Sequence, residues 1–104
     1  MSTQAIAEAA AAMLDGSTSY LLGAREIMGL AFKAGLDRDP DIGPFIGADS
    51  ESDALPIDPD QRKLWHPEAL AQLEPAIAAK EQWAASLLRP YCVRLVERFG
   101  SNSN

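Results

Sequence analysis

One short segment carries most of the negative charge of this chain and limits how the chain can fold. Residues 37–60 hold eight of the 15 acidic residues and one base, Arg38, which gives a formal charge of −7 against −6 for the whole chain. The same segment contains Phe45, Ile46, Leu55 and Ile57. Disordered acidic tracts are poor in such apolar residues. The sequence therefore predicts a long ordered connection fixed to a helical body, and loops of this kind are often functional.

The residues before this segment favour two helices. Residues 4–14 are rich in Ala, the best helix former, and Gly16 provides a left-handed stop. A second helix is predicted at about 19–34, after a run of N-capping residues, with Gly35 just beyond its end. We expect Gly23 and Gly29 to allow close approach of the first helix, so that residues 4–34 form a helical hairpin.

The residues after it favour helix as well. Asp58-Pro59 is typical of a helix start and predicts a short turn over 59–65, and His66-Pro67 begins a C-terminal helical half over 67–99. Pro75 and Pro90 interrupt the helical periodicity, so we expect three pieces, continuous but kinked, over 68–74, 76–89 and 90–99.

The predicted fold class is therefore all-α. We expect a single domain over 1–104, a small helical bundle of three to four helices. An acidic connecting loop over 35–66 links the helical hairpin to the kinked C-terminal half, and 100–104 is a frayed tail.

Composition disfavours several kinds of partner. The acidic balance argues against nucleic acid and against an anionic membrane surface, whereas a basic partner protein fits it. The single cysteine, Cys92, allows no internal disulfide and is typical of a reducing cytoplasm. The N-terminus lacks the positive region of a signal peptide, and no apolar run is long enough to span a membrane.

Asp37-Arg38-Asp39-Pro40-Asp41 resembles the opening of a calcium loop, because oxygen ligands alternate along it. Ile42 and Ala48 stand where such a loop needs Gly and Glu, so we expect turn capping and no metal or other cofactor. Asp49, Glu51 and Asp53 also alternate. We interpret them as turn-forming and ion-pairing residues, since nothing near them indicates a catalytic cleft.

Arg25 lies within an apolar stripe of the second predicted helix, where a guanidinium must reach outward or find a partner. We expect the acidic segment to fold over it, so that Asp49, Glu51 or Asp53 pairs with Arg25 as a structural clasp. Arg62, which precedes Trp65, is a candidate for a similar role.

The remaining chemistry-bearing residues are few. His66 is the only histidine and is predicted to cap a helix, because no nucleophile or metal-ligand motif accompanies it. Cys92 is expected to be a buried structural thiol. Trp65 and Trp83 are either packing residues or anchors for a protein partner, because Trp is enriched among the residues that dominate binding at interfaces.

One set of motifs resembles a known family. Gly23-Ala24-Arg25, then Phe45 and Ile46, then Asp49-Ser50-Glu51-Ser52-Asp53-Ala54-Leu55-Pro56, and finally Arg62 and Trp65 form this set. The layout over about residues 17–99 is similar to a family of small uncharacterised bacterial cytoplasmic proteins, loosely immunity-protein-like. The resemblance implies a bacterial cytoplasmic location and no specific activity.

These observations favour a non-enzymatic protein-binding module, with an immunity-like inhibitor of a basic partner as its most specific form. The candidate interaction and clasp residues are Arg25, Asp49, Glu51, Asp53, Arg62 and Trp65. One alternative is a structural homodimer without a ligand. Another, less favoured, is a small metal-dependent enzyme that uses the acids of the loop.

Overall fold

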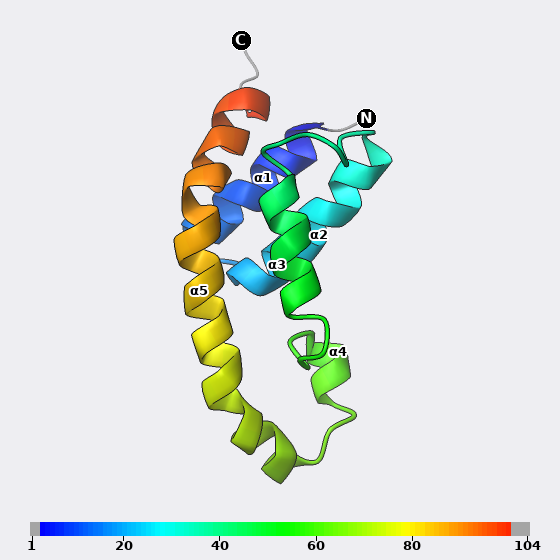
Figure 1. Cartoon of the computed structure of the whole chain (residues 1–104), viewed down its shortest axis with the longest axis vertical. Coiled ribbons are helices and arrows are strands. Elements are labelled where there is room, and N and C mark those ends of the chain that lie inside the picture. The colour runs from blue at the N-terminus through cyan, green and yellow to red at the C-terminus, as the bar shows by residue number, and fades with distance from the viewer. Residues whose placement is uncertain (1–2, 101–104) are drawn as a thin grey trace.

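The chain folds into helices joined by short turns. The computed structural model describes residues 3–100, which form α1 (Thr3–Leu14), α2 (Tyr20–Lys33), α3 (Gly43–Glu51), α4 (Pro59–Arg62) and α5 (Pro67–Phe99) (Figure 1). No strand occurs within this range, so the predicted all-α class is confirmed. Residues 101–104, most of the predicted frayed tail, lie outside the described residues.

The ends of α1 and α2 follow from local chemistry. Gly16 has φ 87° and Gly35 has φ 73°, and both values lie in the left-handed region that glycine adopts without strain. The Ser19 side chain accepts a hydrogen bond from the Leu22 N–H at 3.1 Å, as a helix N-cap does. The predicted boundaries of both helices are therefore confirmed to within one residue.

Gly23 and Gly29 differ in their surroundings. A Cβ atom at Gly23 would overlap the side chain of Met13, which is buried in α1, so this glycine does bring the two helices close together. Gly29 is exposed, and a Cβ atom there would meet nothing within 4 Å. The expected role in close packing is confirmed for Gly23 and wrong for Gly29.

The acidic segment is ordered but is not the loop that we expected over 35–66. It contains α3 and α4, and α3 packs on α2. We missed α3 because Gly43, Pro44 and Gly47 favour a turn. Pro44 instead stands in the first turn of the helix, where its missing N–H has no intrahelical acceptor to lose, and Phe45 is fully buried.

The apolar residues of this segment hold it to the body. Phe45 and Ile57 belong to the hydrophobic core, and Ile46 and Leu55 are partly buried against it. The prediction that apolar side chains fix the acidic segment in place is therefore confirmed.

α5 runs without interruption through both prolines, which confirms the expected continuity over 68–99. Pro75 and Pro90 both lie on exposed positions of the helix. A bend at either residue stays a prediction. The helix start predicted at Asp58-Pro59 is confirmed, because Asp58 caps α4 and Pro59 is its first residue. α3 is an additional helix, and the described range holds five helices where three to four were expected.

The molecule is elongated, with extents of 50 × 23 × 21 Å. α1, α2 and α3 pack along the C-terminal part of α5, whose buried residues are Ala84, Leu88, Cys92 and Leu95. α4 and the start of α5 extend beyond this body (Figure 1). No residue of α4 is buried. One end of the molecule is therefore built with little hydrophobic core.

Candidate functional site

Two acids of the acidic segment are taken up by arginines of α5. Asp41 accepts from Arg94 Nε at 3.0 Å and from Arg98 Nη1 at 2.9 Å. Asp39 accepts from both Nη atoms of Arg98, each at 2.8 Å, and caps the Asp41 N–H at 2.9 Å. Turn capping was expected of both acids; it is confirmed for Asp39 and wrong for Asp41, whose carboxylate bonds to the two arginines instead.

This network shifts the pKa values of Asp39 and Arg98. The hydrogen bonds from Arg98 lower the pKa of Asp39, and burial opposes them. The same bonds raise the pKa of Arg98 above its ordinary value. Asp39 and Asp41 are thus neutralised by guanidinium groups. Within residues 3–100 no three His, Cys, Asp or Glu side chains come together as a metal site would require.

The predicted clasp joins α2 to α3. Arg25 Nε donates to Asp49 Oδ1 at 2.8 Å, and the exposed fractions of the two side chains are 29% and 13%. The contact is a single hydrogen bond, made to Asp49 among the three acids that we considered. Glu51 instead lies 3.5 Å from Lys80 of α5, and Asp53 is exposed with no ion pair in the described chain.

His66 and Cys92 are structural. His66 Nδ1 accepts from the Glu68 N–H at 3.2 Å and caps α5, as predicted. Cys92 is fully buried, and burial raises its pKa to about 12, so its thiol stays protonated.

The remaining candidate residues, Arg62 and Trp65, lie at the end that extends beyond the body. We call residues 53–74 the α4 end. Arg62 pairs with Glu74, which links α4 to α5, and also donates to the Pro56 carbonyl at 3.4 Å. No hydrogen bond or ion pair between described residues links Arg62 or Trp65 to Arg25 or Asp49. The candidate residues therefore fall into two separate groups.

The α4 end exposes apolar side chains. Leu64 is 86% exposed and Trp65 is 40% exposed, and they are adjacent in the turn between α4 and α5. Leu64 has the largest exposed fraction among the large apolar residues of the described chain. A short segment that holds both side chains in water, on an ordered turn, is typical of a contact surface.

A cleft of about 380 Å³ lies between α2, α4 and α5. Leu21, Leu22, Ile57 and Ile77 form its apolar lining, and Arg62, Glu74 and Glu81 are its charged residues. Two of these charges, Arg62 and Glu74, neutralise one another. The cleft therefore offers an apolar surface beside Arg62 of α4, and neither Leu64 nor Trp65 is among its lining residues.

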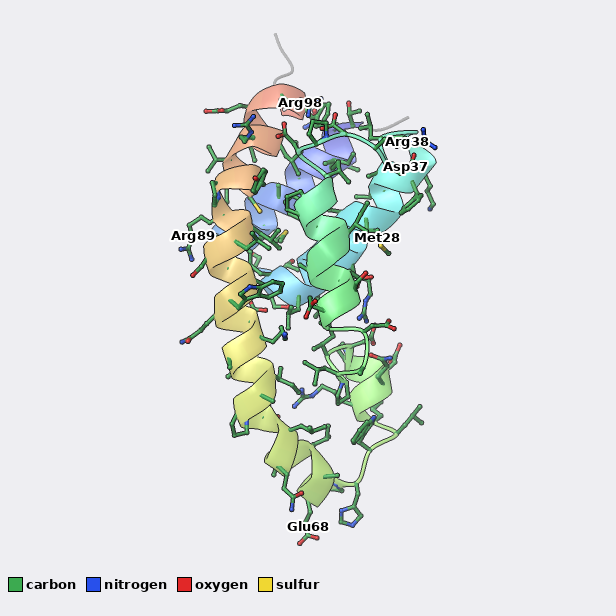
Figure 2. All side chains as sticks on the ribbon, in the orientation of Figure 1. Met28, Asp37, Arg38, Glu68, Arg89 and Arg98 are labelled. Atoms are coloured by element: carbon green, nitrogen blue, oxygen red, sulfur yellow. The ribbon has the colours of Figure 1, made fainter. Side chains whose placement is uncertain are left out.

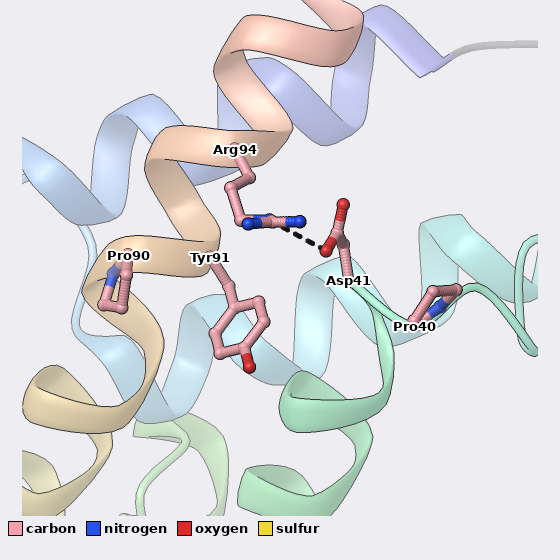
Figure 3. Close-up of a pocket in the computed structure, with 5 residues that line it drawn as sticks. All are labelled: Pro40, Asp41, Pro90, Tyr91 and Arg94. Carbon is pink, nitrogen blue, oxygen red and sulfur yellow. Dashed lines mark hydrogen bonds and ion pairs between the residues drawn. The ribbon is translucent and has the colours of Figure 1, made fainter.

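The α4 end is also acidic. It contains five acids and two bases, Arg62 and Lys63, and so has a formal charge of −3. Figure 2 shows Glu68 at this end of the molecule, and Asp37 and Arg38 near the opposite end. Asp53 and Glu68 are exposed and form no ion pair within residues 3–100. Asp39, Asp41, Asp49 and Glu51, in contrast, each face a base.

Sequence reasoning missed three residues that organise the structure. Arg94 and Arg98 lie four residues apart on α5, so they share one face of the helix, and both bind the pair of acids Asp39 and Asp41. This spacing of the two arginines is visible in the sequence. Glu81 accepts from the Tyr20 N–H at 2.6 Å and from the Leu21 N–H at 3.0 Å, and so caps α2 from another helix. No local pattern indicates that contact.

Comparison of the chain with models of known protein families, with curated proteins and with solved structures finds no match in any of the three. The family resemblance stated above therefore stays a prediction. Within the described residues, no helix is both long enough and apolar enough to cross a lipid bilayer.

Proposed function

We propose that this chain is a non-enzymatic protein-binding module whose binding surface is the α4 end. The observation that carries the proposal is the pair of exposed apolar neighbours, Leu64 and Trp65. Truncation of a Trp that is buried at an interface commonly costs more than 2 kcal/mol of binding free energy. An exposed Trp contributes little to the stability of the unbound protein. The nearby cleft gives a partner side chain an apolar place to bind.

Charge selects the class of partner. The α4 end has a formal charge of −3, and the unpaired acids Asp53 and Glu68 leave a field that attracts a basic surface. Such complementarity raises association rates more than residence times. A basic protein is therefore the proposed partner, and an immunity-like inhibitor that covers the functional surface of a basic toxin is the most specific form of the proposal. Its setting would be a bacterial cytoplasm.

The proposed surface uses a different set of acids from the one that the sequence indicated. The sequence pointed to Asp49, Glu51 and Asp53, but the first two face Arg25 and Lys80. Asp53, Asp60 and Glu68 are exposed acids of the α4 end that neither cap a helix nor pair with an arginine. They replace the earlier set as the candidate steering residues.

The test is to capture a partner with the native chain and then measure its binding to two variants. Leu64→Ser with Trp65→Ser removes the apolar pair, and we expect dissociation to accelerate by about a hundredfold or more. Phe32→Ser is the matched control, because Phe32 is 54% exposed on α2, away from the α4 end. If the control and the double variant weaken binding equally, the α4 end is not the binding surface.

The charge component has its own matched control. Asp53→Asn, Asp60→Asn and Glu68→Gln together should slow association about tenfold at low salt and flatten its salt dependence. Glu8→Gln, Glu26→Gln and Asp37→Asn remove the same charge from exposed positions elsewhere. Equal slowing by both triple variants would mean that only net charge matters.

A further inference from the structure

Residues 58–76 contain no buried side chain, although the chain is anchored on both sides of them. Pro56 and Ile57 are buried just before this stretch, and Ile77 packs against the core just after it. The first buried residue of α5 is Ala84. α4 and the first turns of α5 therefore extend from the body with little apolar contact to hold them (Figure 1).

A single arginine ties α4 to its surroundings. Within residues 3–100, Arg62 makes all the side-chain hydrogen bonds and ion pairs that join α4 to other elements: it pairs with Glu74 of α5 and donates to the Pro56 carbonyl at 3.4 Å. The two paired side chains are 32% and 50% exposed, and pairs in water stabilise little. The other ion pair of α4, Asp60 with Lys63, reaches no other helix.

Pro75 weakens α5 just before the helix rejoins the core at Ile77. A proline has no N–H, so the Ala71 carbonyl lacks its usual partner within the helix. The helix before Pro75 is about two turns long, and α4 has 4 residues and at most a marginal contact with another helix. Helices this short are not stable without packing.

We propose that residues 58–76 open as one unit by local unfolding while the body stays folded. The body is α1, α2, α3 and the part of α5 from Ile77 onward. The pair of Arg62 and Glu74 joins the two halves of this unit, and Pro75 lies at its boundary with the body. Segments that lack buried apolar contacts open at a lower free energy than the whole fold.

The opening changes two features of the α4 end. Leu64 and Trp65 lie in the unit, so their ordered turn exists only in the closed form. Arg62 and Glu74 also line the cleft beside α2, and the opening removes them from it. A partner that binds the closed form would slow the opening. That consequence rests on the proposed function, whereas the opening itself is a property of the free chain.

Hydrogen exchange of the free chain, resolved by residue over a series of urea concentrations below the unfolding transition, tests the proposal. The amides of residues 62–65 and 70–74 are hydrogen-bonded within the unit. Corrected for intrinsic rates, they should exchange at least about a hundredfold faster than the amides between Ala84 and Leu95, with little dependence on urea. Exchange at the rates and urea dependence of the body overturns the proposal.

The two prolines of α5 give a matched pair of variants, since both are exposed and inside the helix. Pro75→Ala restores a helical N–H at the boundary and should slow exchange of the unit by about tenfold or more. Pro90→Ala makes the same change in the body, which stays folded during the opening, and should leave exchange of the unit unchanged. Equal slowing of the unit by both variants would mean that the chain opens only as a whole.

A second pair of variants separates the proposed opening from simple fraying of α5. Arg62→Ala removes the tie to Glu74 and should speed exchange of residues 70–74, on the other helix, by about twofold to fivefold. Lys63→Ala is the control, because its pair with Asp60 stays within one short segment. Rates that fall steadily from residue 70 to residue 74 and do not respond to Arg62→Ala would mean that α5 frays alone, and would contradict the proposal.

Discussion

Arg25 and Asp49 join α2 to α3 through one hydrogen bond of 2.8 Å, with the carboxylate 13% exposed. Removal of the guanidinium leaves a poorly solvated carboxylate. Arg25→Ala should therefore lower the free energy of unfolding by about 2 kcal/mol, more than an exposed pair contributes.

Urea unfolding measures this difference. Arg38→Ala is the control, because Arg38 is exposed and forms no ion pair within the described chain, and it should change stability by less than about 0.5 kcal/mol. A loss below about 1 kcal/mol for Arg25→Ala would mean that the clasp adds little.

Gly23 and Gly29 allow one substitution to be compared at two places in the same helix. At Gly23 a new methyl group meets the buried Met13 side chain, so Gly23→Ala should destabilise by about 1–3 kcal/mol through overpacking. At Gly29 the space is open, so Gly29→Ala should stabilise by about 1 kcal/mol through helix propensity. Thermal unfolding of both variants checks this prediction, and a change of the same sign in both would contradict the packing of α1 on α2.

Glu81 caps α2 across the body, and its loss leaves the N–H groups of Tyr20 and Leu21 without acceptors. Glu81→Ala should cost about 1–2 kcal/mol, and Glu81→Gln less, because an amide oxygen still accepts. Glu97→Ala is the control on the same helix, because Glu97 is exposed and forms no ion pair among the described residues. Chemical denaturation with equal losses for Glu81→Ala and Glu97→Ala would rule out this cap.

Asp39 should make the fold sensitive to acid. Its pKa is lowered in the folded state by the hydrogen bonds from Arg98, so it stabilises the fold above its unfolded pKa of about 3.9. That contribution is lost as pH falls below about 4 and through the folded pKa. Asp39→Asn should therefore flatten the dependence of stability on pH in this range.

Unfolding measured at several pH values tests this point. In an Arg98→Ala background the same substitution should have a smaller effect, because the group that lowers the pKa is gone. An identical pH dependence for the native chain and Asp39→Asn would show that the contact with Arg98 does not hold in solution.

The helices could be predicted where sequence signals are local. Gly16, Ser19 and Gly35 fix the ends of α1 and α2 through their own backbone and side-chain chemistry. α3 was missed because burial of Phe45 and Ala48 against other helices outweighs the turn preference of its glycines. A helix that depends on tertiary packing is poorly marked in its own residues.

The candidate site shows the same division. Arg25 could be matched to Asp49 because an arginine in an apolar stripe needs a partner. Which acid would remain exposed could not be predicted, since it depends on where α5 places Lys80, Arg94 and Arg98. Because of such a long-range contact Glu51 is paired with Lys80, whereas Asp53 forms no ion pair in the described chain, although the two acids lie two residues apart.

Hydrogen–deuterium exchange of the native chain with its captured partner tests the central claim most directly. If the partner binds the α4 end, amide protection should increase over about residues 59–73 and not over α1 or the end of α2. The Leu64→Ser, Trp65→Ser variant should lose this protection under the same conditions. Protection confined to other helices, with residues 59–73 unchanged, would contradict the account.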